Sequence, residues 1–365
     1  MKALFITADF GGNIPPTLAV AEELAARGAE VEVAGLPGGR TDLGQVAFAP
    51  AEAIASSAGR RPVAQAAAML SLMAGRKTIR TTSSLIRNNR PDVVVIDCMA
   101  AAPLRGALST GVPVVILFHT LGAYWARSFD RGPMGRALRL TGIRPGELWA
   151  RATERLLLTD RTLDPGRDDP ALHDFFWTGT TEVGTPPRPT ERRPRILVAL
   201  SSTDWPGMLP VYRRIVTALS RLPVEATVTT GGARLGGQLA GAANVEIRDW
   251  VSHAELLPHM DLVIGHGGHS TTMKVLAHGV PLLVMPINAT SDQRLIGTTV
   301  KTAGLGDWLP KSASPDTIGE TVTSILSNDA VRDAAFENGQ RLRGLRPGAE
   351  VAADRIARSP HVRLP

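Results

Sequence analysis

The stretch from His266 to Thr272, His-Gly-Gly-His-Ser-Thr-Thr, has the residue types of a phosphate-binding loop. It follows the run 261–264, Asp-Leu-Val-Ile, which we interpret as a strand, and glycines after a strand let backbone N–H groups approach an anion. A helix that begins near Ser270 would direct its positive end toward a diphosphate. Two alternatives are a plain strand-to-helix turn with a structural His266, and a metal site at His266 and His269, for which no third ligand is close in sequence.

Other reactive side chains follow apolar runs that we interpret as strands. Asp97 follows the run 93–96, and His119 ends the run 112–118. Both are expected at the carboxyl edge of a sheet, where catalytic groups of α/β proteins gather. His119 would face a ligand there, or it would be a structural or surface histidine.

The segment from Asn244 to Asp307 resembles the nucleotide-sugar-dependent glycosyltransferases of the GT-B fold, the UDP-glycosyltransferase-like enzymes that decorate bacterial antibiotics and macrolides. That family has, in order, a W-V-P-Q segment, an H-G-G-x-G-T-T segment, a G-V-P turn and a late D-Q pair. The corresponding segments here are Trp250-Val251-Ser252-His253, 266–272, Gly279-Val280-Pro281 and Asp292-Gln293, with a short insertion within 288–291.

This resemblance implies a donor site in the second half of the chain. His266 with Thr271 or Thr272 would bind the diphosphate, and Trp250 with the Val251 backbone would hold the base. Asp292 and Gln293 would bind sugar hydroxyls. The further donor-site candidates are Ser202 and Thr203, in a Ser/Thr loop after the run 195–200, together with Gly267, Gly268, Ser270 and Lys274.

Lys274 and His253 depart from the family pattern. The family usually has a glutamate at the position of Lys274, where it accepts hydrogen bonds from ribose hydroxyls, and a lysine cannot accept them. Three interpretations of Lys274 follow: it lies beside the diphosphate, the donor carries deoxyribose as thymidine-linked sugars do, or the lysine is solvated on its helix. His253 replaces a glutamine.

The segment Phe10 to Thr17 resembles the family's G-H-x-x-P loop, whose histidine removes the proton from the acceptor. Asn13 stands at that histidine's position, and an amide cannot act as a base near neutral pH. Asp97 matches the family's aspartate partner. Proton removal would then fall to His119 or Asp9, or the acceptor would carry an acidic proton.

Acceptor contacts are expected from Phe10, Tyr124 and Trp125. Tyr124 and Trp125 belong to the segment 122–139, in which aromatic side chains alternate with arginines. The same pattern is equally compatible with helical core packing.

The elements that must position these residues repeat in the two halves of the chain. A strand at 3–7, a glycine loop, an amphipathic helix at 17–27 and a strand at 31–34 form a βαβ unit. The runs 93–96, 112–118 and 156–158 predict strands that are buried on both faces and therefore parallel. Residues 195–200 begin the same alternation again.

We predict an α/β protein of the GT-B type with two Rossmann-like domains whose parallel sheets face a central cleft. The acceptor-binding domain is expected at 1–177, a proline-rich linker at 178–194 and the donor-binding domain at 195–345. Residues 346–365 are expected to form a helix or tail that packs back toward the first domain.

Composition narrows the class of protein. A chain of 365 residues, 44% hydrophobic and 20% charged, fits two globular domains. Its apolar runs are shorter than the roughly 18 residues of a membrane helix, and the amino-terminal run lacks the length of a signal peptide. Cys98 is the single cysteine, which favours a reducing cytoplasm. The net charge of +6 comes from dispersed arginines, so nucleic acid is not an expected partner.

The resemblance implies an inverting hexosyl- or deoxysugar transferase that uses a UDP- or dTDP-sugar and a small natural-product acceptor. No D-x-D pair of the kind that holds a metal-bound diphosphate occurs, so neither a metal nor a further cofactor is expected. A monomer or homodimer is expected. The alternatives are a sugar-nucleotide epimerase, a transferase for a lipid-linked sugar, and a non-catalytic partner of the same fold that lost the base.

Overall fold

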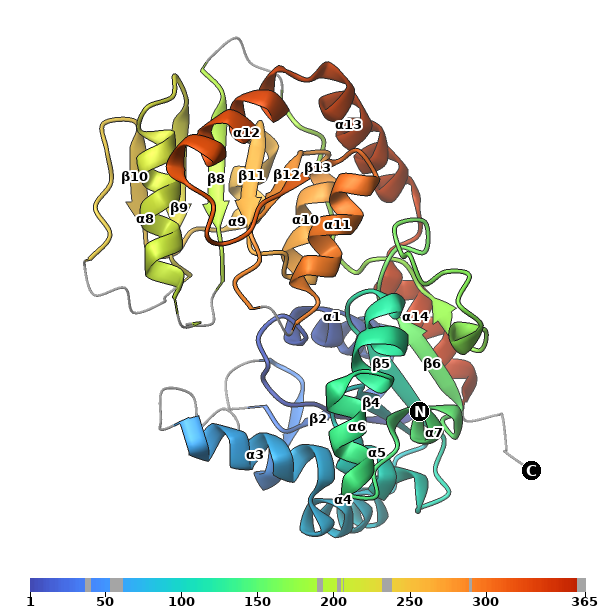
Figure 1. The fold of residues 1–365 in the computed structure, drawn as a ribbon. Coiled ribbons are helices and arrows are strands. Elements are labelled where there is room, and N and C mark those ends of the chain that lie inside the picture. Colours follow the sequence, from blue (N-terminus) through green and yellow to red (C-terminus); the bar gives the residue numbers. More distant parts are fainter. Residues whose placement is uncertain are drawn as a thin grey trace. The chain divides into compact units, whose positions relative to one another are not determined.

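The computed structural model describes residues 1–36, 41–52, 62–188, 193–201, 205, 207–231, 238–288 and 291–359. The chain divides into two compact units (Figure 1). The N-terminal unit is Met1–Thr181 with Arg346–Pro365, and the C-terminal unit is Glu182–Leu345.

The N-terminal unit has a seven-stranded sheet with the order β3-β2-β1-β4-β5-β6-β7, in which every neighbouring pair is parallel. Its strands are β1 (Lys2–Ile6), β2 (Glu30–Ala34), β3 (Gly44–Val46), β4 (Val93–Asp97), β5 (Val114–Phe118), β6 (Glu154–Leu157) and β7 (Phe176–Trp177). Its α-helices are α1 (Ile14–Ala26), α3 (Pro62–Ala74), α4 (Arg76–Asn89), α5 (Ala101–Leu108), α6 (Pro133–Leu140), α7 (Pro145–Ala150) and α14 (Gly348–Arg358). A π-helix, η1, spans Tyr124–Asp130, and a short 3₁₀-helix, η2, spans Pro170–Leu172.

The last helix, α14, packs on the N-terminal unit. Its residues Ala352, Ala353 and Ile356 are buried in the same core cluster as β1 and α1. Arg27 at the end of α1 pairs with Asp354 at 2.5 Å. Arg355 pairs with Glu154 of β6 at 2.8 Å. Apolar burial and these ion pairs together hold the end of the chain on the first sheet.

The C-terminal unit has a six-stranded parallel sheet with the order β10-β9-β8-β11-β12-β13. Its strands are β8 (Arg195–Ala199), β9 (Glu225–Thr229), β10 (Val245–Arg248), β11 (Leu262–Gly265), β12 (Leu282–Val284) and β13 (Gly306–Trp308). Its helices are α8 (Met208–Leu219), α9 (His253–Leu256), the 3₁₀-helix η3 (Leu257–His259), α10 (His269–His278), α11 (Gln293–Thr302), α12 (Pro315–Ser327) and α13 (Asp329–Gly344).

Both sheets reverse their strand order at one point, between β1 and β4 in the first and between β8 and β11 in the second. Ligands of such sheets bind beyond the carboxyl ends of the strands at this reversal. The central strands β4 and β5 are buried along their whole length and are apolar apart from Asp97 at the end of β4, as parallel strands covered on both faces should be. The predicted α/β class with two parallel sheets is confirmed.

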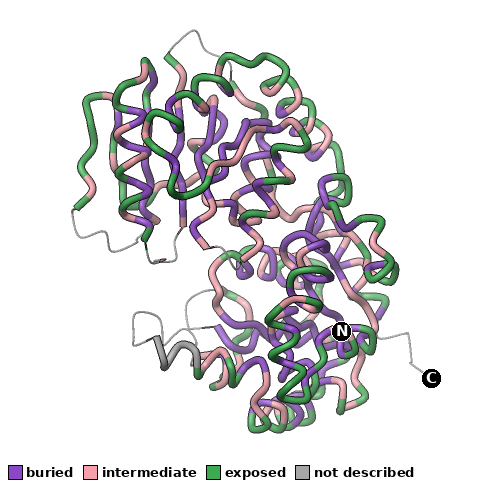
Figure 2. Tube along the Cα trace, viewed as in Figure 1, coloured by how far each residue is buried: buried purple, intermediate pink, exposed green. Residues whose placement is uncertain are grey.

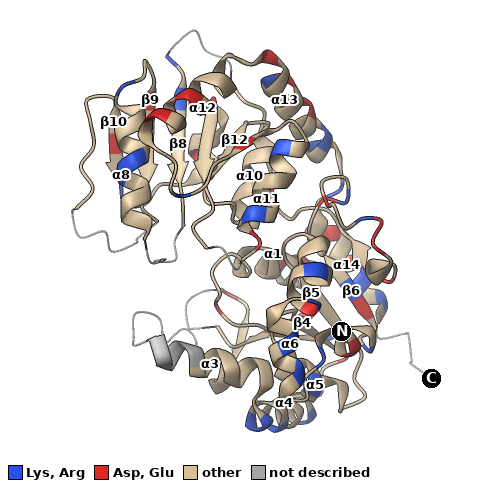
Figure 3. Cartoon of the chain, viewed as in Figure 1, with Lys and Arg blue, Asp and Glu red and all other residues tan. Residues whose placement is uncertain are grey.

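The burial pattern follows these layers, with buried strands under helices whose outer faces are exposed (Figure 2). Basic and acidic residues are interspersed over both units (Figure 3). Within the described ranges, no helix combines the length and the apolarity that crossing a membrane would require.

Candidate functional site

The loop between β11 and α10 contains two glycines that a side chain would obstruct. Gly267 has a φ of 85°, and a Cβ there would lie 2.8 Å from the backbone oxygen of Gln293. Gly268 is extended, and a Cβ there would lie 2.7 Å from Cε1 and Nε2 of His266. The imidazole of His266 therefore lies against the backbone just before α10. No described side chain caps this helix, so its first N–H groups are placed to bind an anion.

His266 is a neutral imidazole in this setting. Burial lowers its pKa to about 4. Its Nδ1 atom is buried and has no hydrogen-bond partner within the described part of the chain. Such an atom costs about 1–3 kcal/mol relative to a satisfied one. A ligand that forms a hydrogen bond with this ring would remove that cost.

Lys274 and Ser270, both on α10, contact the same carboxylate. Lys274 Nζ lies 3.2 Å from Glu182 Oε2. The hydroxyl of Ser270 donates to Oε1 of Glu182. Lys274 is thus in an ion pair rather than fully solvated. The pKa of His253 is lowered, mainly by the burial of that ring and secondly by the positive charge of Lys274.

Gln293 and Asp292 lie where the loop after β12 enters α11. The Oε1 atom of Gln293 accepts hydrogen bonds from the N–H groups of Ile287 at 2.8 Å and Asn288 at 2.9 Å. The side chain of Gln293 thereby fixes this loop, and its oxygen is already engaged. The predicted contact with sugar hydroxyls would fall to Asp292, the residue before α11, and to the amide nitrogen of Gln293.

The remaining donor-site candidates differ in exposure. Trp250, after β10, is 76% exposed, so its ring offers an aromatic face for stacking. Val251 and Thr271 are half-buried, whereas Thr272 is buried. His253 Nε2 lies 3.3 Å from Thr229 Oγ1 at the end of β9. Ser202 and Thr203 lie outside the described residues.

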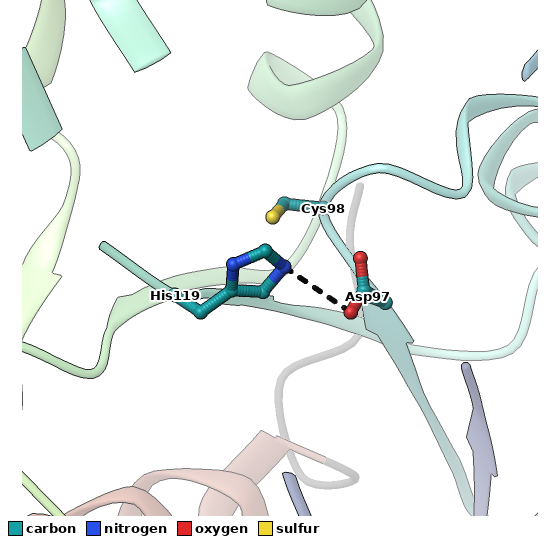
Figure 4. A group of neighbouring side chains, drawn as sticks. All are labelled: Asp97, Cys98 and His119. Atoms are coloured by element: carbon teal, nitrogen blue, oxygen red, sulfur yellow. Dashed lines mark ion pairs between the residues drawn. The ribbon is translucent and has the colours of Figure 1, made fainter. Parts of the chain in front are cut away.

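In the N-terminal unit, three predicted residues meet beyond the carboxyl ends of β1, β4 and β5. Asn13 Nδ2 donates to Asp97 Oδ2 at 2.7 Å and to the Ala8 carbonyl at 2.9 Å. His119 Nε2 lies 3.3 Å from the same Asp97 oxygen (Figure 4). The latter pair lacks hydrogen-bond geometry, and in the described ranges Nε2 has no other partner. An amide, a carboxylate and an imidazole thus form one cluster.

Charge interactions in this cluster shift the pKa values of both ionisable partners. Burial raises the pKa of Asp97, but His119, the Met99 N–H and Asn13 outweigh burial, so the pKa is lowered. Burial lowers the pKa of His119, but Cys98 and Asp97 outweigh it, and the pKa is raised well above 6.5. Burial also raises the pKa of the Cys98 thiol to about 11. The thiol is therefore neutral near pH 7, and the Asp97 carboxylate is the charge that favours imidazolium.

The backbone after His119 is strained. Thr120 has a φ of 75°, a left-handed conformation that β-branched residues rarely adopt, and its buried hydroxyl lacks a hydrogen-bond partner among the described residues. Such a conformation costs about 1–3 kcal/mol and is typical of functional sites. Trp125 Nε1 donates to the His119 carbonyl at 2.8 Å. This contact holds the end of β5, and with it the imidazole, in place.

The other acceptor-side candidates have different surroundings. Asp9 Oδ1 accepts a hydrogen bond from the Gly11 N–H at 2.9 Å, and Phe10 is half-buried against the core. Trp125 is 1% exposed and packs edge-on against Phe118 and Phe129. Of the two alternatives for Trp125, the structure therefore shows core packing. Tyr124 is half-buried at the start of η1 and remains a candidate contact.

Two family models match the chain, one in each half. Residues 17–159 match the model of glycosyltransferase family 4, and residues 213–356 match that of the erythromycin biosynthesis protein CIII-like C-terminal domain. Demethyllactenocin mycarosyltransferase of Streptomyces fradiae is 34% identical over 180 residues, which cover 47% of this chain and 37% of that relative. The matched segment thus spans less than half the length of this relative.

Solved structures match over the whole chain. The glycotransferase of kitacinnamycin aligns with a TM-score of 0.77 at 24% identity and covers 98% of both chains. The glycosyltransferase VinC, solved in complex with dTDP, aligns with a TM-score of 0.75 at 18% identity and covers 99% of this chain and 100% of its own. This chain has the GT-B fold. The predicted resemblance to the GT-B glycosyltransferases of antibiotic biosynthesis is confirmed.

Three residues near the two candidate sites were not predicted from the sequence as functional residues. Cys98 directly follows Asp97, and its position after a buried strand could have indicated a place at the sheet edge. Thr120 carries its strain in the backbone, which no residue type reveals. Glu182 lies in a proline-rich stretch without periodicity, so its pairing with Lys274 had no sequence signal.

Proposed function

We propose that this chain is an inverting, metal-independent glycosyltransferase that moves a sugar from UDP or dTDP to a small natural-product acceptor. The observation that carries the proposal is the β11–α10 loop, where a neutral His266 lies against a glycine backbone at an uncapped helix start. The confirmed GT-B fold supports a nucleotide sugar as the ligand of this loop.

The donor would bind with its diphosphate at the first turn of α10. As the bond to the anomeric carbon breaks, negative charge builds on the diphosphate. The N–H groups of the first turn and one N–H of His266 would stabilise that charge without having to reorient. Trp250 would cover the base, and Asp292 would bind sugar hydroxyls.

The acceptor would lose its proton to His119. Asp97 would orient the imidazole and stabilise its protonated form, and Asn13 would act as a positioning residue that holds Asp97 Oδ2. Because the neighbouring carboxylate favours imidazolium, the base would become active as the pH rises through the raised pKa of His119. Direct attack on the anomeric carbon, with no covalent intermediate, inverts its configuration.

A thermal unfolding screen against UDP- and dTDP-sugars tests the donor class. A ligand present at 100 times its Kd stabilises the folded state by about 2.7 kcal/mol. We expect at least one such sugar nucleotide to raise the Tm, and His266→Ala to reduce that rise. If no sugar nucleotide raises the Tm, the chain is better interpreted as a non-catalytic partner protein. The presence of Asn13 at the position of a catalytic base favours that alternative.

A further inference from the structure

We propose that Asp97, Cys98 and His119 bind one Zn²⁺ ion, and that this ion switches the enzyme off. The inhibitory part rests on the proposed role of His119 as the base. The binding part does not, because it follows from the three side chains themselves.

The ligand atoms are close enough to share one ion. One atom each from Asp97, Cys98 and His119 lies within 4.8 Å of the others (Figure 4). A tetrahedral ion with bonds of about 2.0–2.3 Å needs ligand atoms roughly 3.3–3.8 Å apart. The 3.3 Å between His119 Nε2 and Asp97 Oδ2 already meets this spacing. Since β4 and β5 are paired neighbours, Cys98 lies beside His119, and rotation of the Cys98 side chain would complete the set.

The unusual contact between His119 and Asp97 supports an ion at this place. The two atoms lie at ion-pair distance without hydrogen-bond geometry, and in the described residues Nε2 is buried without another partner. An imidazole nitrogen and a carboxylate oxygen at this spacing are compatible with a shared metal ion. The His119 side chain is 17% exposed, whereas its Nε2 atom and the side chains of Asp97 and Cys98 are buried, so the ion would be largely shielded from solvent.

The ligand types select the metal. A thiol, an imidazole and a carboxylate suit Zn²⁺, whereas Mg²⁺ and Ca²⁺ prefer shells of oxygen atoms. On binding, the Cys98 thiol and the His119 imidazolium each release one proton to solvent, and the sulfur and Nε2 form bonds to zinc. Water would take the fourth position. Asn13, which donates to Asp97 Oδ2, would orient that ligand from outside the shell.

A bound zinc ion would occupy the Nε2 lone pair with which His119 would otherwise remove the proton from the sugar acceptor. The protein would then be inactive with zinc and active after chelation. Cys98 does not contact the sugar or remove a proton in the proposed transfer. Variants of Cys98 can therefore distinguish the loss of zinc binding from the loss of turnover.

Equilibrium dialysis with ZnCl₂ on the full chain tests the site, together with the cobalt-thiolate absorption of the Co²⁺-loaded protein. We expect one zinc per chain and a thiolate band in wild type. Cys98→Ser should abolish the band and weaken zinc binding at least about a hundredfold, beyond the loss expected from an outer-shell partner. His173→Gln is the matched control, because it removes an exposed histidine 3.1 Å from Asp174 and should change neither readout. Cys98→Ala provides a second variant if the serine destabilises the core.

The site would be overturned if wild type and Cys98→Ser bound zinc equally, or if His173→Gln removed the binding. Either result would mean an adventitious surface ion only. Absence of binding would overturn it as well. Zinc should inhibit turnover of wild type but not of Cys98→Ser, each compared with its own activity in the presence of a chelator. If zinc binds at Cys98 yet turnover persists, the site stands and the assignment of His119 as the base is wrong.

Discussion

Gly268→Ala should weaken donor binding because the new methyl group displaces the His266 imidazole. The Cβ would lie 2.7 Å from Nε2 and Cε1 of that ring. Carbon and nitrogen atoms normally approach no closer than about 3.5 Å. The ring must therefore move by roughly 0.8 Å, which is enough to break a hydrogen bond to a phosphate oxygen.

The expected size of the effect is that of one hydrogen bond to a charged group. Such a bond contributes about 1.5–3 kcal/mol, or a tenfold to hundredfold change in Kd. The fold should be unaffected, because Gly268 has a φ of −67° and a ψ of 131°, which alanine adopts without strain. Loss of affinity without loss of stability is thus the expected signature.

A double-mutant cycle identifies the route of the effect. We would measure the Kd of the donor by calorimetry for wild type, Gly268→Ala, His266→Ala and the double variant. With the imidazole removed, the alanine has no ring to displace, so Gly268→Ala should cost little in the His266→Ala background. Gly319→Ala in α12 is the control, because a Cβ there meets no atom within 4 Å.

Two results would refute this reasoning. An unchanged Kd in Gly268→Ala would mean that the imidazole does not contact the donor. An equal loss in both backgrounds would mean that the methyl group blocks the backbone rather than moving His266.

Three further predictions follow from the same residues. The pKa of His266 is lowered to about 4 in the folded state, so the unfolded state binds this proton more readily below about pH 6.5. The free energy of unfolding of wild type should therefore fall by up to about 3 kcal/mol between about pH 6.5 and about pH 4. Urea unfolding should show a smaller fall in His266→Gln, and equal falls would contradict the assignment. His119→Ala should lower turnover at saturating donor at least about tenfold and Asn13→Ala should lower it less, whereas full activity of both, and of Asp9→Asn, toward an unactivated alcohol would exclude this route of proton removal. Thorough chelation of divalent metals should leave turnover intact or raise it, and a loss restored by Mg²⁺ or Mn²⁺ would overturn metal independence.

The central strands of both sheets were predicted because their signal is local, whereas the short outer strands β3, β7, β10 and β13 were not predicted. Apolar runs such as Val93–Ile96 belong to parallel strands, and the polar residues after them share one edge. This geometry explains why Asp97 and His119 could be expected there from sequence alone. The start of α1 was less certain: the sequence placed it at Thr17, but the helix begins at Ile14, because Pro15 and Pro16 fit a first turn.

Long-range and conformational features were not predictable in the same way. Trp125 lies in a π-helix, whose side-chain directions do not follow the α-helical period, so its burial could not be derived from spacing. The ion pair of Glu182 with Lys274 joins positions far apart in the chain. From the sequence, Cys98 indicated only the redox compartment, because its proximity to Asp97 and His119 depends on the pairing of β4 with β5.

The most direct test of the central claim is a calorimetric titration of dTDP and of UDP into the full chain in the presence of a chelator. We expect one nucleotide bound per chain, with a Kd about tenfold to hundredfold weaker in His266→Ala and unchanged in His119→Gln. Binding of neither nucleotide to wild type, or binding that is indifferent to His266→Ala, would contradict it.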